Sequence, residues 1–208
     1  MPRKRPATRH PAAHRVRLLR LRAKKRRVRR HRTRKMGRLV VASVLLWGLI
    51  AGFYLAWAWT FDLREVGRIP ESSLVIDRNG KVYTRLSGEN RRTVPLDRVS
   101  PWFVRAVIAR EDSRFLQHFG VDPLGIARAA LTNLSAGSIR QGGSTLTQQL
   151  ARNSFPLGGQ NMHRKVLEAA LAVRMEAVLS KDEILTHYMN RIYFGAGLFG
   201  IETASQAY

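Results

Sequence analysis

The stretch PWFVRAVIAREDSRFLQHFG, residues 101–120, joins a helical pattern to a cluster of polar side chains. Proline is favoured at the first position of a helix. Apolar residues then recur at i, i+3 and i+4, and Glu111 falls on the same stripe at i+7. The pattern therefore predicts a helix with a buried carboxylate near its end. Such a carboxylate either forms an ion pair, with Arg110 or Arg114, or takes part in chemistry.

Further helical patterns follow, so the chain is expected to be mainly α-helical. Asp97 or Ser100 can cap the first helix. Ser180, with Glu183 three residues later, matches a capping box. Gly137 is a suitable helix stop. The downstream helical segments cover residues 122–137, 145–153, 163–179 and 180–195.

Upstream, β-branched and aromatic residues lie on both sides of Asn79-Gly80. Asn-Gly between such runs is a strong signal for a tight β-hairpin. A small β element is therefore expected within residues 62–96, a linker that leads into a domain over residues 97–208. Residues 89–101 are expected to form a loop.

Residues 39–61 contain no charged side chain. A helix needs roughly 20 residues to cross the hydrocarbon core of a bilayer. Tyr54, Trp57 and Trp59 gather towards one end, as interfacial aromatic residues do. A cleavable signal peptide is the alternative, but its apolar core usually has about 7–15 residues and ends in small residues. The pattern favours a retained transmembrane helix.

Residues 1–38 contain 18 of the 37 Lys and Arg residues and no acidic residue. By the positive-inside rule this tail is cytoplasmic, and residues 62–208 lie outside. A basic tail can also bind nucleic acid, but this one has almost no aromatic residues to stack on bases. A disordered tail that binds anionic lipids is the favoured interpretation, and no nucleic-acid partner is expected.

The chain has no cysteine, which excludes a disulfide framework, a thiol nucleophile and a cysteine zinc site. Its 208 residues allow one globular domain at most beside the membrane segment. Tyr208 ends an apparently helical segment without a cap. Residues 97–208 are therefore expected to form a domain that is incomplete at its C-terminal end.

Four motifs carry the candidate functional residues. They read EDSRFLQHFG at 111–120, QGGSTLTQQLARN at 141–153, RKVLEAALAVRMEAVLSKDEIL at 164–185 and YMNRIYFGAGLFGIETA at 188–204. In this order and spacing they resemble the peptidoglycan glycosyltransferase domain (glycosyltransferase family 51) of bacterial cell-wall polymerases. The resemblance covers roughly residues 72–208.

The resemblance implies a mainly α, lysozyme-like fold at the membrane surface. It implies that lipid II, a disaccharide-pentapeptide on undecaprenyl pyrophosphate, is polymerised into β-1,4-linked glycan with inversion and release of the lipid pyrophosphate. The implied partners are lipid II, the growing glycan strand, the membrane and proteins of the cell-wall synthesis complex. The lead-in segments IDRNGK and ENRRTVPL resemble class A penicillin-binding proteins, so a transpeptidase domain is expected beyond Tyr208 in the parent protein.

The resemblance makes Glu111 the general base, which a sugar 4-hydroxyl needs because it is a poor nucleophile at neutral pH. Burial on an apolar stripe would raise the pKa of this carboxyl and make it a better proton acceptor. Glu168 is implied to be the second acid, which assists departure of the leaving group or holds a divalent metal such as magnesium. No cofactor is obligatory. An ordinary i, i+4 salt bridge between Arg164 and Glu168 is the alternative.

Further residues are implied to bind substrate. Asp112 supports the site. Phe115 and His118 lie at i+4 and i+7 from Glu111 if the helix continues, although His118 could equally be a hydrogen-bonded structural histidine. Glu183 could be only the capping-box acid. The other candidates are Ser144, Thr145, Gln148, Gln149, Arg152, Asn153, Arg164, Lys165 and Asn190.

A leaving pyrophosphate needs cations or a helix N-terminus to neutralise its charge. Ser144 and Thr145 stand where a helix begins, which fits either pyrophosphate binding or a simple N-cap. The resemblance assigns pyrophosphate binding to Arg164 and Lys165. Arg152 stands where the family usually has lysine, which keeps the charge but replaces a point charge by a planar fork.

Two other functions compete with polymerisation. A lysozyme-like hydrolase or lytic transglycosylase could share the fold and one glutamate, but it would not need the basic pair Arg164 and Lys165. An inactive fragment could instead act as a membrane scaffold through its basic tail and apolar helix.

Overall fold

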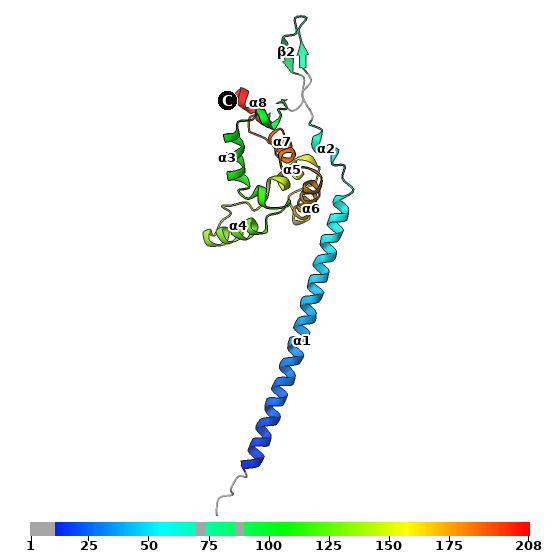
Figure 1. Ribbon diagram of the computed structural model, residues 1–208, viewed down its shortest axis with the longest axis vertical. Coiled ribbons are helices and arrows are strands. Elements are labelled where there is room, and N and C mark those ends of the chain that lie inside the picture. The colour runs from blue at the N-terminus through cyan, green and yellow to red at the C-terminus, as the bar shows by residue number, and fades with distance from the viewer. Residues whose placement is uncertain (1–10, 70–73, 86–89) are drawn as a thin grey trace, which may run out of the picture. The chain divides into compact units, whose positions relative to one another are not determined.

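The computed structural model describes residues 11–69, 74–85 and 90–208 and divides into two compact units, Met1–Ala51 and Gly52–Tyr208. Helix α1 (Pro11–Ala58) makes up the described part of the first unit, and its last turns belong to the second (Figure 1). Within the described residues one helix, Lys35–Ala58, is long and apolar enough to cross a membrane, and no residue of its most apolar stretch is buried.

The basic tail differs from the expectation of disorder. Residues 11–38 are helical and continue into the apolar segment without a break, while residues 1–10 lie outside the described residues. Arg, Lys, Leu and Ala all have high helix propensity, so the helix extends upstream instead of starting at the apolar run.

The predicted hairpin is confirmed. Strand β1 (Leu74–Ile76) pairs antiparallel with β2 (Val82–Arg85), and Asn79-Gly80 lies in the turn between them. Gly80 has φ of +80°, a region that glycine enters without steric cost. The short helix α2 (Arg64–Gly67) precedes this hairpin.

The loop expected over residues 89–101 contains a strand and a turn of 3-10 helix. Strand β3 (Asn90–Arg91) pairs in parallel with β4 (Leu198–Phe199), and η1 (Leu96–Arg98) follows. The expectation of a plain loop was wrong because this pairing joins segments about 100 residues apart. No local pattern in either segment indicates it.

The predicted helices downstream are all present. Ser100 precedes the first of them, although its side chain forms no cap hydrogen bond, and Pro101 opens it. The predicted stop at Gly137 has φ of +60°, as an αL cap requires. The elements are α3 (Pro101–Glu111), η2 (Phe115–Gln117), α4 (Pro123–Ala136), α5 (Leu146–Ser154), α6 (Met162–Val178), α7 (Lys181–Met189) and α8 (Ile201–Ala207).

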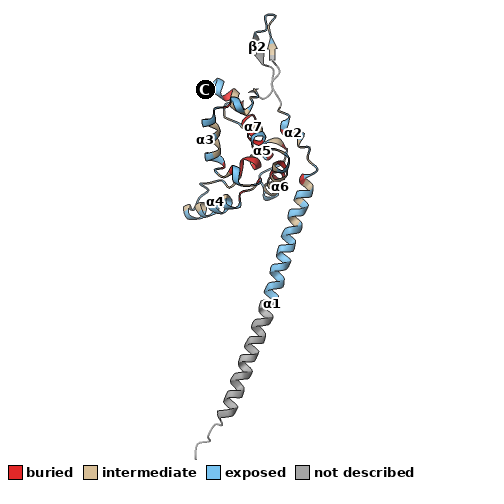
Figure 2. Cartoon of the chain, viewed as in Figure 1, coloured by how far each residue is buried: buried red, intermediate tan, exposed pale blue. Residues whose placement is uncertain are grey.

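Helices α5, α6 and α7 form the core of the second unit, and buried residues concentrate on them (Figure 2). Each buried large aliphatic side chain contributes roughly 1.5–3 kcal/mol to stability by leaving water. The fully buried residues of these helices include Leu146, Leu150, Leu171, Met175, Ile184 and Met189.

Two buried or half-buried arginines fix the chain upstream of the helical domain onto this core. Arg174 donates to the carbonyl oxygen of Phe61 at 2.6 Å and to that of Ala58. Arg191 donates to the carbonyl oxygens of Glu65, Val66 and Arg68 at 2.9–3.0 Å. The end of α1 and helix α2 are therefore held by charged donors as well as by apolar packing.

Candidate active site

A cavity of about 600 Å³ lies between the C-terminal end of α3, helix α4 with the loop after it, and the start of α5. Segments of the first two sequence motifs contribute to the wall, and the fold brings them together. The predicted site residues that line the cavity are Glu111, Asp112, Ser144, Thr145, Gln149 and Arg152.

Glu111 is the last residue of α3, and its side chain is exposed at the cavity. Its Oε2 accepts a hydrogen bond from Gln149 Nε2 at 3.0 Å. The prediction that Glu111 ends a buried stripe was wrong. The helix stops there and the cavity opens beside it, so the stripe packs on the core through the preceding Val104, Val107 and Ile108 and not through Glu111.

Asp112 ties the first two motifs together. This buried residue caps the C-terminal end of α3, and its Oδ2 accepts from the backbone N–H of Leu146 at 3.0 Å and from His118 Nε2 at 2.9 Å. Because the chain leaves the helix after Glu111, His118 does not continue the α3 face as predicted. His118 instead occupies the structural, hydrogen-bonded position that was the alternative for it.

The start of α5 has the geometry of a strong helix cap. Thr145 accepts from the N–H of Gln148, whose side chain accepts from the N–H of Thr145, which completes a capping box. The Thr145 hydroxyl also donates to the carbonyl oxygen of Gly120 at 2.6 Å. Ser144, which precedes the cap, accepts from Lys165 Nζ at 2.6 Å and thereby joins the cavity wall to α6.

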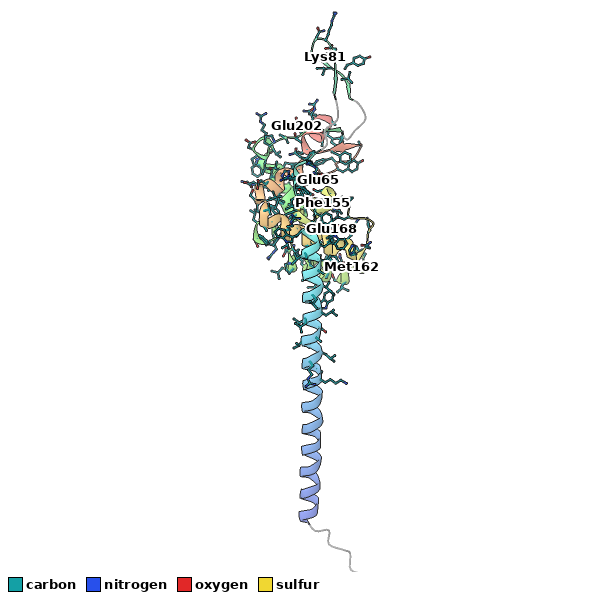
Figure 3. The ribbon with its side chains drawn as sticks, turned by 90° about the vertical axis from the view of Figure 1, so that its right-hand side faces the viewer. Glu65, Lys81, Phe155, Met162, Glu168 and Glu202 are labelled. Atoms are coloured by element: carbon teal, nitrogen blue, oxygen red, sulfur yellow. The ribbon has the colours of Figure 1, made fainter. Side chains whose placement is uncertain are left out.

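Glu168 on α6, labelled in Figure 3, is fully buried and paired with two cations. Its two carboxylate oxygens lie 3.2 Å from Arg164 Nε and 2.9 Å from Lys165 Nζ. Both cations follow Asn161, whose side chain caps α6. The salt bridge that was the alternative for Arg164 and Glu168 is therefore present, and it includes Lys165 as well.

A comparison with protein families decides the class of this domain. The family model named Transglycosylase matches residues 79–208, more than half of the chain. The chain belongs to the transglycosylase family. The predicted peptidoglycan glycosyltransferase class and the mainly α fold of this transglycosylase domain are thereby confirmed.

Curated relatives of the transglycosylase chain agree. Penicillin-binding protein 1A of Escherichia coli (strain K12) is 46% identical over 134 residues, which are 64% of this chain and 16% of that protein. Penicillin-binding protein 1A of Aquifex aeolicus (strain VF5) is 42% identical over 67% of this chain and 19% of its own length. The biosynthetic peptidoglycan transglycosylase of Cronobacter sakazakii is 38% identical over 84% of this chain and 70% of that protein. The chain thus spans about a fifth of the penicillin-binding proteins that it matches.

Several residues predicted to bind substrate lie outside the cavity wall of this transglycosylase domain. Phe115 is fully buried in the core, under the ammonium group of Lys181, 4.3 Å from the ring centroid. Gln148 is buried in the α5 cap. Asn190 is buried and bonded to the backbone of Val94, and Asn153 accepts from a guanidinium through its carbonyl oxygen.

Glu183 lies in the capping box of α7, which was the alternative interpretation of this residue. Its carboxylate accepts from the N–H and the hydroxyl of Ser180 at 2.7 and 2.8 Å. These hydrogen bonds lower the pKa of Glu183, the backbone donor most strongly. Glu183 is not among the described residues that line the cavity.

Three arginines in the cavity wall were not predicted as site residues. Arg110, Arg128 and Arg140 line the cavity together with Arg152. Across residues 11–69, 74–85 and 90–208, none of these four guanidinium groups forms an ion pair or a side-chain hydrogen bond. Arg128 lies one helical turn from Gly125 and from Thr132 on α4, which also line the cavity, so helical spacing could have indicated it. Arg140 depends on the fold of the loop after α4.

Asn133 holds that loop against α4. Its Oδ1 accepts from the backbone N–H groups of Arg140 and Gln141 at 2.8 and 2.9 Å, and its Nδ2 donates to the carbonyl oxygen of Gln141 at 2.9 Å. Three hydrogen bonds from one side chain fix the backbone that carries Arg140.

The carboxylates of the cavity leave this positive charge largely unbalanced. Asp122 pairs with Arg114 at 3.2 Å, and Asp112 is already bonded to His118. Glu111 is the remaining carboxylate in the wall. An anionic ligand therefore meets a cavity in which, among the described residues, four guanidinium groups are unpaired and one carboxylate is accessible.

The donor set at Glu168 does not fit a divalent metal. Both of its oxygens face the cations Arg164 and Lys165, and the residue has no exposed surface. Within the described ranges no three His, Asp or Glu side chains cluster as metal ligands. The magnesium site stays a prediction from the resemblance.

Proposed function

We propose that this chain polymerises lipid II into β-1,4-linked glycan with inversion and releases undecaprenyl pyrophosphate. The observation that carries the proposal is the exposed carboxylate of Glu111 in a cavity lined by unpaired arginines. A reaction between a sugar hydroxyl and a sugar pyrophosphate needs both a base and an excess of cations.

In this proposal Glu111 accepts the proton of the 4-hydroxyl of the acceptor sugar. The hydroxyl oxygen attacks the anomeric carbon of the donor from the face opposite the pyrophosphate. The bond between that carbon and the pyrophosphate oxygen breaks, and the pyrophosphate leaves with the electron pair. Displacement from the opposite face inverts the anomeric centre.

Cations at the cavity stabilise the charge on the departing pyrophosphate. Arg152 lines the wall, and Lys165 reaches the wall through Ser144 at 2.6 Å. Glu168 has no path to the reacting atoms in this proposal. It holds Arg164 and Lys165 in place, which replaces the role of second acid that the resemblance implied.

The membrane helix gives the reaction its location. A candidate span that ends at Ala58, and relatives named penicillin-binding proteins, fit a membrane-anchored protein. We place the N-terminus in the cytoplasm by the positive-inside rule and the catalytic domain outside, where lipid-linked precursors present their disaccharides. Proteins of the cell-wall synthesis complex are the partners we expect there.

The test is a polymerisation assay with the full chain in liposomes that contain lipid II. We expect glycan strands from the parent chain and none from Glu111→Gln. Glu202→Gln, the same chemical change on α8 at a residue that does not line the cavity, is the matched control and should leave polymer formation unchanged.

Two outcomes would contradict the proposal. If the chain cuts preformed glycan and does not extend lipid II, it is a wall-cleaving enzyme. If a folded chain binds membranes but neither makes nor cuts glycan, a scaffold function replaces the proposed polymerase function.

A further inference from the structure

Gln149 forms hydrogen bonds through both ends of its side-chain amide. Its Nε2 donates to Glu111 Oε2 at 3.0 Å, and its Oε1 accepts from the hydroxyl of Tyr188 at 3.2 Å. The three side chains come from α3, α5 and α7. A continuous chain of hydrogen bonds therefore runs from the core of the domain to the carboxylate in the cavity.

The two ends of this amide are not interchangeable. An ionised carboxylate only accepts hydrogen bonds, so the NH₂ group of Gln149 must face Glu111. The amide oxygen then faces Tyr188, which must donate. Burial, and after it the negative charge of Glu111, raise the pKa of Tyr188 to about 12, against a smaller opposing effect of Arg152. The phenol therefore remains a donor throughout the pH range in which the enzyme works.

Tyr188 is also rigidly held. It is only 4% exposed and packs in the core formed by α5, α6 and α7. Helix α7 begins at a complete capping box, which fixes its first turn. By contrast, Gln149 is half-buried and Glu111 is exposed, so the tyrosine is the fixed end of the chain of hydrogen bonds.

We propose that Tyr188 is a positioning residue for catalysis. Its hydroxyl holds the Gln149 amide with the NH₂ group towards Glu111, which orients the carboxylate and leaves its second oxygen for the acceptor hydroxyl. This inference rests on the proposed role of Glu111 as general base. It adds a residue from the fourth motif that acts through Gln149 and touches no substrate.

Loss of the Tyr188 hydroxyl has a specific consequence for the Gln149 amide and for Glu111. Without the phenol, the amide oxygen loses its donor and the amide can rotate to aim that oxygen at the carboxylate. An oxygen in this position repels the ionised form of Glu111 and accepts a hydrogen bond from the protonated form. The base is then misoriented and takes up its proton at a higher pH.

The test is Tyr188→Phe, which removes one hydroxyl and keeps the ring. We expect kcat for lipid II polymerisation to fall about tenfold, as for the loss of one hydrogen bond in a low-dielectric setting. KM should change less than about twofold, and the acidic limb of the pH profile should move to higher pH. Tyr83→Phe, on an exposed strand of the hairpin, is the matched control and should change none of these values.

A double-mutant cycle separates positioning from packing. If Tyr188 acts through Gln149, adding Tyr188→Phe to Gln149→Leu should cause no further loss of kcat. A loss that is fully additive, or a fall in kcat with no movement of the acidic limb, would overturn the inference. Melting temperatures of all variants show whether lost packing accounts for the change.

A readout that needs no turnover separates this inference from the proposed function. In chain labelled with ¹³C at glutamate carboxyls, the resonance missing from Glu111→Gln identifies that carboxyl. Its titration midpoint should rise in Tyr188→Phe. An unchanged titration midpoint would contradict the positioning role of Tyr188 even if the chain polymerises lipid II. A moved midpoint in a chain without polymerase activity supports the coupling and counts only against the proposed function.

Discussion

The two glutamates of the transglycosylase domain lie in opposite environments. Glu111 is exposed at the end of α3, with one hydrogen bond from an amide. Glu168 is fully buried in α6, with a cation on each oxygen. The sequence motifs place both residues in one active site, but the structure gives them different surroundings.

The different environments of Glu111 and Glu168 suit two different tasks. A general base must meet the substrate and exchange its proton, so it needs access and only a few fixed partners. A carboxylate that neutralises and positions cations works best when it is buried and fully paired, because the paired charges then keep one geometry. The following predictions test whether Glu111 and Glu168 divide the work in this way.

The largest expected effect is on activity in Glu111→Gln. Polymerisation should fall by about 10²–10⁴-fold, the contribution usual for a positioned general base. The melting temperature should stay unchanged, because the side chain is exposed and keeps a similar shape. Polymerisation rates and thermal unfolding of the same preparation measure both. A large drop in melting temperature would show that Glu111 has a structural role and would contradict the contrast with Glu168.

In contrast to Glu111→Gln, Glu168→Gln should lower the stability of the folded chain. The change leaves Arg164 and Lys165 without their buried counter-charge. It should lower the free energy of unfolding by about 3 kcal/mol, the low end for a broken buried pair because Lys165 is partly exposed. Denaturant unfolding measures this value.

The control for Glu168 is an exposed ion pair. Glu65→Gln, which breaks the pair with Arg68 on the surface, should change the free energy of unfolding by less than about 0.5 kcal/mol. Equal effects of the two substitutions would contradict the structural role of Glu168.

Acid sensitivity should come from outside the cavity, at His187. Burial, and then the charge of Arg191, lower the pKa of His187, while Glu183 opposes this. The unfolded chain therefore binds the proton first as pH falls below about 6.5, and stability decreases. His187→Gln should flatten the decline of melting temperature between about pH 7 and pH 5. A pH dependence identical to that of the parent chain would exclude this histidine as the cause.

Apart from the control substitutions, the smallest effect is expected at a helix cap. Ser180→Ala removes the side-chain acceptor for the N–H of Glu183 at the start of α7. It should lower the free energy of unfolding by about 1 kcal/mol, as at other N-caps, and leave polymerisation unchanged at temperatures well below unfolding. A loss of activity without a loss of stability would show that the start of α7 contributes to the site.

Local sequence signals predicted most of the secondary structure. Asn79-Gly80 specified a hairpin, Gly137 a helix stop and Ser180 a capping box, and each is present. All three depend on backbone conformations and hydrogen bonds within a few residues. Such features can be deduced without knowing what packs against them.

The errors concern contacts between distant segments. The stripe that predicted a buried Glu111 describes one face of a helix, but not where that helix ends against a cavity. The parallel pairing of β3 and β4 depends on a fold that joins separate parts of the chain, and it leaves no periodic pattern to detect.

The sequence by itself determined the helical character of the domain, an apolar helix long enough for a membrane and the motifs that mark the family. These follow from periodicity, length and residue type. Only the tertiary structure decided that Glu111 is exposed, that Glu168 is buried between cations, and that hydrogen bonds join Tyr188 to Glu111 through Gln149. Burial and hydrogen-bond partners belong to pairs of residues that the fold brings together, and a linear pattern does not specify such pairs.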